Sequence, residues 1–113
     1  MNIEFKTKEL QKCAEDFNHA VKKLGMVCAK KFFQRLAQLT TASSFEELRF
    51  AVGRFHELRE DRKGQWSFDL EHPKRLIITP ITQPIPVDAD GKYVWSNITD
   101  ALLIEIVDYH KEG

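Results

Sequence analysis

The chain has 113 residues and a mass of 13.2 kDa, which leaves no room for a second domain but is long enough to bury one hydrophobic core. Lys plus Arg and Asp plus Glu each total 17, so the net charge is zero and does not by itself indicate a polyanionic partner. The charges are nevertheless segregated. Residues 1–75 hold 15 basic and 11 acidic side chains, whereas residues 76–113 hold 2 and 6.

The sequence contains no run of about 18 apolar residues and no apolar core of a signal peptide at residues 1–8. We therefore expect a cytoplasmic protein that does not associate with a membrane. Cys13 and Cys28 are expected to be small buried side chains without a disulfide, and their spacing makes a poor zinc site. No metal and no cofactor are expected. His19 and His72 are expected to face solvent.

The first half of the chain predicts helices. Apolar residues recur at helical spacing over Leu10–Leu24, with Thr7 as a candidate N-cap and Gly25 placed to end the helix. A second amphipathic stripe covers Ala29–Leu39. Two antiparallel helices are therefore expected to form a hairpin over residues 7–42.

From Arg54 onward the apolar period changes to two, which predicts a sheet over residues 54–110, preceded by a short alternating segment at residues 3–5. The expected strands lie around Phe55–Leu58, Trp66–Leu70, Leu76–Ile81 and Leu102–Val107. The last is apolar at nearly every position, so it should lie inside the sheet. The predicted fold class is α+β: one domain over residues 1–113, with the helical hairpin packed on a mostly antiparallel, twisted sheet.

A long connection, residues 82–100, precedes the last strand. Pro84 and Pro86 interrupt strand pairing, and Asp88–Gly91 predicts a turn. Tyr93–Trp95 is too apolar for a disordered loop. We therefore expect either an extra edge strand or a packed flap in this segment.

The sequence lacks the glycine patterns of nucleotide sites, the Gly-x-Ser-x-Gly of serine hydrolases and the His-Glu-x-x-His of zincins. What remains is a set of histidines and cations in the sheet half. The segment Arg54–Leu70 contributes His56, Arg59, Arg62 and Lys63; Arg75 opens the next strand, and Asp108, Tyr109 and His110 follow the last one. If the strand that contains His56 neighbours the last strand, then acid, base and cation share one edge of the sheet.

This arrangement resembles a known family. The segment Arg54–Ser67 reads Arg-x-His-x-Leu-Arg, then Arg-Lys-Gly-x-Trp-Ser, and Ile106–His110 ends in Asp-Tyr-His. This combination is similar to the HigB-type killer toxins of the RelE/ParE superfamily, with residues 82–100 as an insertion. The resemblance implies a RelE-like fold and a toxin of a type II toxin–antitoxin system. It also implies a ribosome-dependent mRNA endoribonuclease that needs no metal, contacts ribosomal RNA and is neutralised by a helix-turn-helix, HigA-like antitoxin.

The expected chemistry is RNA cleavage through the 2′-hydroxyl, which needs a base, an acid and cations on the phosphate. His56, Asp108 and His110 are candidates for acid and base, and which acts as which stays open. Arg75 is the candidate for the scissile phosphate, and Tyr109 for stacking on a base or orienting the nucleophile. The expected phosphate-binding residues are Arg54, Arg59, Arg62 and Lys63.

Two alternatives remain. The zero net charge, and Arg59-Glu60 where the family has Lys-Gly, favour a non-catalytic module that binds the antitoxin and co-represses the shared promoter. A gyrase-directed toxin of the ParE type is the other alternative, but that activity has no need of the paired histidines.

Overall fold

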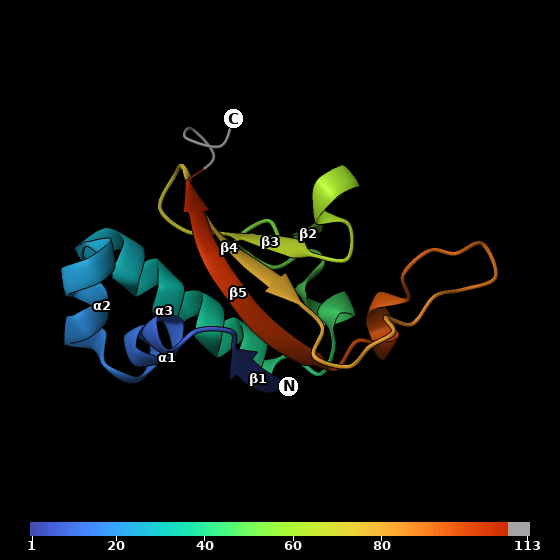
Figure 1. Ribbon diagram of the computed structural model, residues 1–113, viewed down its shortest axis with the longest axis horizontal. Helices are drawn as coiled ribbons and strands as arrows, with labels where there is room; N and C mark the ends of the chain where they lie inside the picture. The colour runs from blue at the N-terminus through green and yellow to red at the C-terminus, as the bar shows by residue number, and fades with distance from the viewer. Residues whose placement is uncertain (109–113) are drawn as a thin grey trace.

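A computed structural model describes residues 1–108 as an α+β fold with three α-helices and a five-stranded mixed sheet (Figure 1). The helices are α1 (Lys8–Glu15), α2 (Phe17–Leu24) and α3 (Met26–Thr41). The strands are β1 (Asn2–Phe5), β2 (His56–Glu57), β3 (Trp66–Asp69), β4 (Lys74–Thr79) and β5 (Asp100–Asp108). Short 3-10 helices are η1 (Phe45–Leu48), η2 (Glu60–Arg62) and η3 (Trp95–Asn97). No helix within residues 1–108 is long and apolar enough to cross a membrane.

The helical half has three helices where two were expected, because the first amphipathic stripe divides at Asp16. This residue has an extended backbone (φ −137°, ψ 105°), and its Oδ1 accepts a hydrogen bond from the His19 N–H at 3.2 Å. A capping aspartate stabilises a new helix start, and here that local preference overrides the apolar periodicity. The expected N-cap at Thr7 and the expected helix end at Gly25, with φ 84°, are confirmed.

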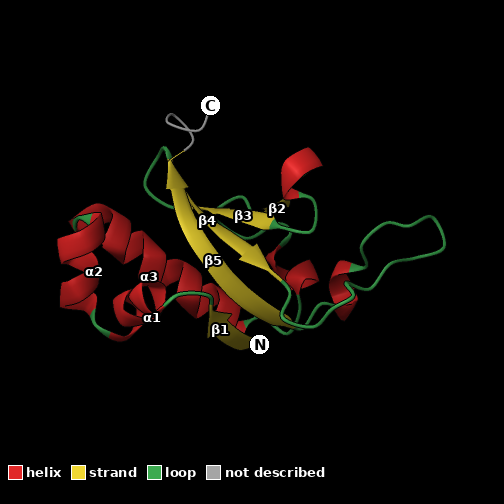
Figure 2. Ribbon diagram, viewed as in Figure 1, coloured by secondary structure: helices red, strands yellow, loops and turns green. Residues whose placement is uncertain are grey.

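The strands lie in the order β1-β5-β4-β3-β2 (Figure 2). Only β1 and β5 pair in parallel, so the sheet is mostly antiparallel, and β5 lies in its interior as expected. The strand β2 is a two-residue edge strand. Because β3 and β4 lie between β2 and β5, the axes of these two strands are three spacings, or roughly 14 Å, apart. The strand that holds His56 is therefore not a neighbour of the last strand.

The two faces of the sheet differ, because successive side chains of a strand point to opposite sides. The face covered by the helices holds the main core, which includes Phe32, Phe45, Trp66 and Phe68, each fully buried. Edge-to-face aromatic contacts link this core; the rings of Phe45 and Trp66, for example, lie 5.0 Å apart. The other face, here called the polar face, bears Ser67, Asp69, Arg75 and Glu105 by strand register, around a small apolar cluster. That cluster contains Ile77, Ile104 and Val107, with Leu58 packed against it.

The 82–100 segment, here called the flap, forms no edge strand. Its returning part packs on the core through the buried Trp95 and Ile98, whereas residues 87–92 are exposed. The flap leaves the sheet where Asp100 Oδ1 accepts hydrogen bonds from the N–H groups of Ile81 and Thr82, at 2.8 and 3.1 Å. One isolated bridge joins Val87 to Tyr93 across a turn. The segment then returns to the sheet, where the Trp95 ring lies 5.7 Å from Trp66. The flap thereby comes to lie beside the β2 edge.

Cys13 and Cys28 are both buried and unpaired, as expected. The expectation for His72 also agrees with the structure, because its side chain is exposed. His19 differs, since only 13% of its side chain is exposed and its Nε2 lies 2.9 Å from Glu9 Oε1.

Candidate functional site

A row of side chains on the polar face leads from the edge strand into the sheet. The register pairs His56 with Ser67 and Ser67 with Ile77, and Asp69 with Arg75 one step along. These positions share a face because they are two residues apart along each strand. The buried Ser67 hydroxyl makes no hydrogen bond within residues 1–108. The row places a histidine, a hydroxyl and a carboxylate–guanidinium pair on one surface.

Asp69 is the centre of an ion-pair cluster with two arginines. Its Oδ2 lies 3.2 Å from Arg54 Nε, and its Oδ1 lies 3.2 Å from Arg75 Nε. Two guanidinium groups against one carboxylate leave one net positive charge. The Arg54 side chain is two-thirds exposed, whereas that of Arg75 is mostly covered. The cluster can therefore offer a cationic surface to a phosphate group.

The backbone beneath this cluster is held by Arg35 from α3. Arg35 is 5% exposed and donates from Nε to the Asp69 carbonyl oxygen at 2.6 Å. Burial lowers the pKa of the Arg35 guanidinium from its usual range. The Asp69 N–H donates to the Gly53 carbonyl at 2.8 Å, which ties the strand to the start of the histidine segment. Gly53 has φ 110°, and an added Cβ would lie 2.7 Å from Arg35 Nε, so glycine is required there.

His56 is oriented by the backbone of Arg54. Arg54 adopts a left-handed conformation with φ 49°, and its carbonyl oxygen lies 2.7 Å from His56 Nδ1. A carbonyl oxygen only accepts hydrogen bonds, so Nδ1 carries the proton and Nε2 of the neutral ring is the basic nitrogen. The half-buried His56 side chain thus has one nitrogen fixed and the other suited to proton transfer.

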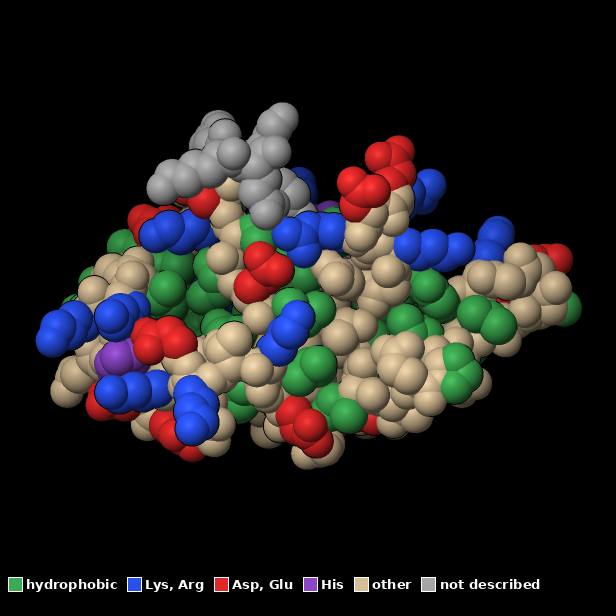
Figure 3. Space-filling view, in the orientation of Figure 1, with side chains coloured by type: hydrophobic (Ala, Val, Ile, Leu, Met, Phe, Trp, Pro, Cys, Tyr) green, Lys and Arg blue, Asp and Glu red, His purple; other side chains and the backbone are tan. Residues whose placement is uncertain are grey.

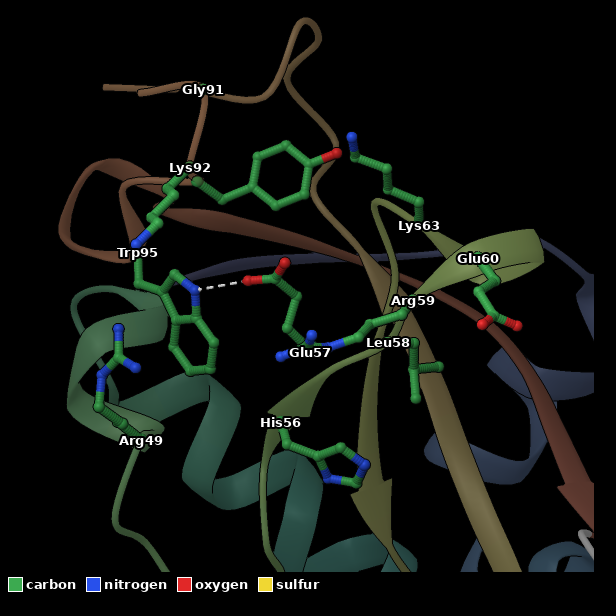
Figure 4. Close-up of a pocket in the computed structure, with 11 residues that line it drawn as sticks. Arg49, His56, Glu57, Leu58, Arg59, Glu60, Lys63, Gly91, Lys92 and Trp95 are labelled. Carbon is green, nitrogen blue, oxygen red and sulfur yellow. Dashed lines mark hydrogen bonds between the residues drawn. The ribbon is translucent and has the colours of Figure 1, made fainter. Parts of the chain in front are cut away.

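A cleft of about 850 Å³ lies beside His56, between the β2 edge and the flap (Figure 4). Four cations line it: Arg49, Arg59, Lys63 and Lys92. Two carboxylates, Glu57 and Glu60, lower its net charge to +2. The space-filling view shows Lys and Arg side chains gathered along this edge, with acidic side chains among them (Figure 3).

The wall of the cleft formed by the flap is fixed by two contacts of Trp95. Its Nε1–H donates to Glu57 Oε1 at 3.1 Å, the bond drawn in Figure 4. The Arg49 guanidinium lies 3.9 Å from the centroid of the Trp95 ring, in cation–π geometry. Because Trp95 is 8% exposed, it supports the wall and Arg49 presents the accessible surface.

The residues singled out from the sequence do not all lie together. His56, Arg59 and Lys63 line the cleft, and Arg54 and Arg75 belong to the Asp69 cluster. Arg62 lies on the polar face, where its Nη1 is 3.8 Å from Glu105 Oε2.

Asp108 on β5 pairs with Lys74 on β4. Two residues along each strand, Ile106 pairs with Leu76, which belongs to the core on the face covered by the helices. By this register the Asp108 side chain belongs to the face opposite to that of His56. Tyr109 and His110 lie outside the described residues.

Sequence reasoning missed several residues of the site: Arg49, Asp69, Lys92, Tyr93 and Trp95. Asp69 could have been found from the sequence, because it follows Ser67 by two residues in a predicted strand and so lies on the same face. Arg49 and Trp95 gave none, since they are far apart in the sequence and meet only through the return of the flap. Among residues 1–108, no group of three metal-ligating side chains surrounds His56.

No protein-family model matches the chain, and no curated protein matches it in sequence. The resemblance to HigB-type toxins therefore stays a prediction from the motifs quoted above.

Proposed function

We propose that this protein is a HigB-type toxin with a RelE-like fold, which cleaves mRNA on the ribosome without a metal ion. The observation that carries the proposal is the polar face itself. There, His56 with a basic Nε2 lies in the same row of side chains as the Asp69 cluster with its two arginines. His56 also lines the cation-lined cleft. General acid–base cleavage of RNA needs a proton-transfer group and cations on one surface.

The family pattern also has a counterpart in the backbone. Glu60 adopts φ 55°, a left-handed conformation that favours glycine. The toxins that this chain resembles have Lys-Gly where it has Arg59-Glu60. A glycine conformation at the position of the family glycine supports the alignment of Arg54–Ser67 with the toxin motif.

In the proposed reaction, a base removes the proton of the RNA 2′-hydroxyl, and the 2′-oxygen attacks the adjacent phosphorus. The bond to the 5′-oxygen breaks, an acid protonates that oxygen, and the products are a 2′,3′-cyclic phosphate and a 5′-hydroxyl. His56 Nε2 fills one proton-transfer role, and His110 with Tyr109 fills the other. Asp108 takes no part in this proton transfer, because by register its side chain belongs to the face of the sheet opposite to that of His56. Arg75 and Arg54 stabilise the extra negative charge on the phosphate. Arg59, Arg62 and Lys63 bind neighbouring phosphates and ribosomal RNA.

Induced expression in a bacterial host tests this proposal. Wild-type protein should stop growth and shorten mRNAs on translating ribosomes, and co-expression of a helix-turn-helix antitoxin should restore growth. We expect His56→Ala and Arg75→Ala to restore growth by lowering cleavage roughly 100-fold or more. His72→Ala removes an exposed histidine from the β3–β4 turn and should leave toxicity unchanged. Normal growth with folded wild-type protein would contradict the proposal.

A second candidate function is a non-catalytic module that binds the antitoxin and co-represses their promoter. One observation favours it: carboxylates already compensate part of the positive charge that a phosphate would need. Asp69 forms ion pairs with Arg54 and Arg75, and two glutamates line the cleft. Intact mRNA, together with antitoxin-dependent promoter binding that persists in His56→Ala, would select this function over the nuclease.

A further inference from the structure

A second group of chemically reactive side chains lies at the opposite end of the molecule from the cleft, where α1 and α2 meet (Figure 1). Glu9 and Cys13 are one turn apart on α1, so they share one helix face. His19 lies in the first turn of α2 and points back to them. Figure 3 shows a histidine among basic and acidic side chains at this end.

The three ligand atoms are close together. His19 Nε2 lies 2.9 Å from Glu9 Oε1, and Cys13 Sγ lies 3.9 Å from the same oxygen. All three atoms lie within 4.8 Å of one another. In a tetrahedral zinc site, bond lengths of about 2.0–2.3 Å place ligand atoms roughly 3.3–3.6 Å apart. Side-chain adjustments of about 1 Å therefore bring this group into zinc geometry.

We propose that Glu9, Cys13 and His19 form a zinc site that joins α1 to α2. A thiolate, an imidazole and a carboxylate are ligand types that Zn²⁺ accepts together, and three protein ligands leave a fourth position for water. With zinc bound, the thiolate and carboxylate balance the dication, so the site is neutral. This site is separate from the proposed nuclease, and the two proposals stand or fall independently.

The surroundings of the three residues are already ordered. Cys13 is 3% exposed and His19 mostly buried, while the Glu9 side chain is about half exposed, so the site has one side open to solvent. A cavity of about 260 Å³, bordered by Thr7 and Lys23, lies beside Glu9 and Cys13. Asp16, which caps α2 through the His19 N–H, fixes the start of the helix that carries the imidazole.

The break at Asp16 is what creates the group. In one continuous helix, Cys13 and His19 would be six residues apart, or about 600° of rotation, on different sides of the helix. With α2 folded back on α1, the imidazole reaches the thiol side of α1. Without a metal, the same contacts are a Glu–His hydrogen bond beside a core cysteine, and this is the alternative that an experiment must exclude.

The test is Co²⁺ binding to the purified full-length protein after chelator treatment, followed by displacement with Zn²⁺. We expect one equivalent of Co²⁺ with a thiolate-to-cobalt charge-transfer absorption, abolished by one equivalent of Zn²⁺. Cys13→Ala should remove this absorption, whereas the matched variant Cys28→Ala, which truncates the other buried cysteine, should retain it. Glu9→Gln and His19→Ala change less buried positions and should each weaken binding on the order of tenfold or more.

Thermal unfolding gives a second measurement on the unaltered chain. Zn²⁺ at about one hundred times its dissociation constant should raise the melting temperature by roughly 10 °C, a shift that His19→Ala should lose. The proposal is wrong if wild-type protein shows no thiolate absorption, or if the absorption persists in Cys13→Ala. It is also wrong if both Glu9→Gln and His19→Ala bind Co²⁺ as tightly as wild type.

Discussion

The two faces of this sheet are built from the same strands but carry different properties. In β3, Trp66 and Phe68 point into the aromatic core, whereas Ser67 and Asp69 point to the polar face. In β4, Leu76 belongs to the core and Arg75 to the Asp69 cluster. Alternation with a period of two therefore separates residues that stabilise the fold from residues that offer chemistry.

The backbone is strained on both sides of the edge strand β2. Among residues 1–108, the non-glycine residues with positive φ are Arg54 and Glu60, which flank β2 beside the cleft. No such residue lies in the α-helices or in the strands of the described chain. Strained backbone is retained where the surrounding structure enforces it, which is often at functional sites. Substitutions on the core face should therefore change the free energy of unfolding, whereas substitutions on the polar face should change RNA binding.

Truncation of a core aromatic is expected to have the largest effect. Phe68 is fully buried, with its ring 5.0 Å from Phe55 and 5.3 Å below the Arg35 guanidinium. Phe68→Ala should lower the free energy of unfolding by about 3–5 kcal/mol, measured by urea denaturation. The neighbouring Ser67→Ala, on the other face, should change it by less than about 1 kcal/mol, because the Ser67 hydroxyl makes no hydrogen bond within the described part of the chain. A similar loss for both variants would contradict the division between the faces.

Gly53→Ala is expected to have the second-largest effect on the free energy of unfolding. The added methyl group would lie 2.7 Å from both Arg35 Nε and a carbon of the Phe68 ring, at φ 110°. We expect a loss of about 2–4 kcal/mol in the free energy of unfolding, from strain and overpacking together. Gly91→Ala is the matched control, since Gly91 also has positive φ but has open space around it, and only the smaller conformational cost should appear. Equal losses would show that the close approach at Gly53 is unimportant.

These contacts mark the limit of what the sequence predicts. Thr7 and Gly25 are found as helix ends because capping is a local property of residue type. The four strands of the sheet half are found approximately because their apolar period is local as well. The break at Asp16 is missed, since the apolar stripe continues through it and the capping preference of one side chain decides the outcome.

The candidate site is predicted only in part, for a different reason. His56, Arg59 and Lys63 lie close together in the sequence and line one cleft. The flap contacts depend on tertiary structure, because Trp95 meets Glu57 across 38 residues. Strand order is not local either, so periodicity could not show that β3 and β4 separate β2 from β5.

Neutralising Asp69 should leave stability nearly unchanged and alter RNA binding. Asp69→Asn removes the carboxylate between Arg54 and Arg75, and partly exposed ion pairs of this kind contribute only about 0–1 kcal/mol. The loss of this carboxylate makes the cluster more positive by one charge, which should tighten binding to single-stranded RNA several-fold. The same change should also steepen the dependence of log K on log salt by about 0.7 for each added phosphate contact. Glu4→Gln removes the same charge from β1, at the far edge of the sheet, and should leave both quantities unchanged. An identical salt dependence in Asp69→Asn and wild type would remove the cluster from the RNA surface.

The smallest effect is expected at Glu60, where a substitution should raise the stability of the protein. At φ 55°, a residue that has a Cβ is strained by about 1–2 kcal/mol, whereas glycine is not. Glycine in turn favours the unfolded chain by roughly 0.5–1 kcal/mol through its greater conformational entropy. Glu60→Gly should therefore raise the free energy of unfolding by up to about 1 kcal/mol, and Glu60→Ala should not raise it through the backbone. Both variants remove one carboxylate from the cleft, so both should bind RNA more tightly to the same extent. A gain in stability shared by the two variants would assign it to charge, and only a gain confined to Glu60→Gly shows that the strained backbone beside β2 is a cost that the fold carries at this site.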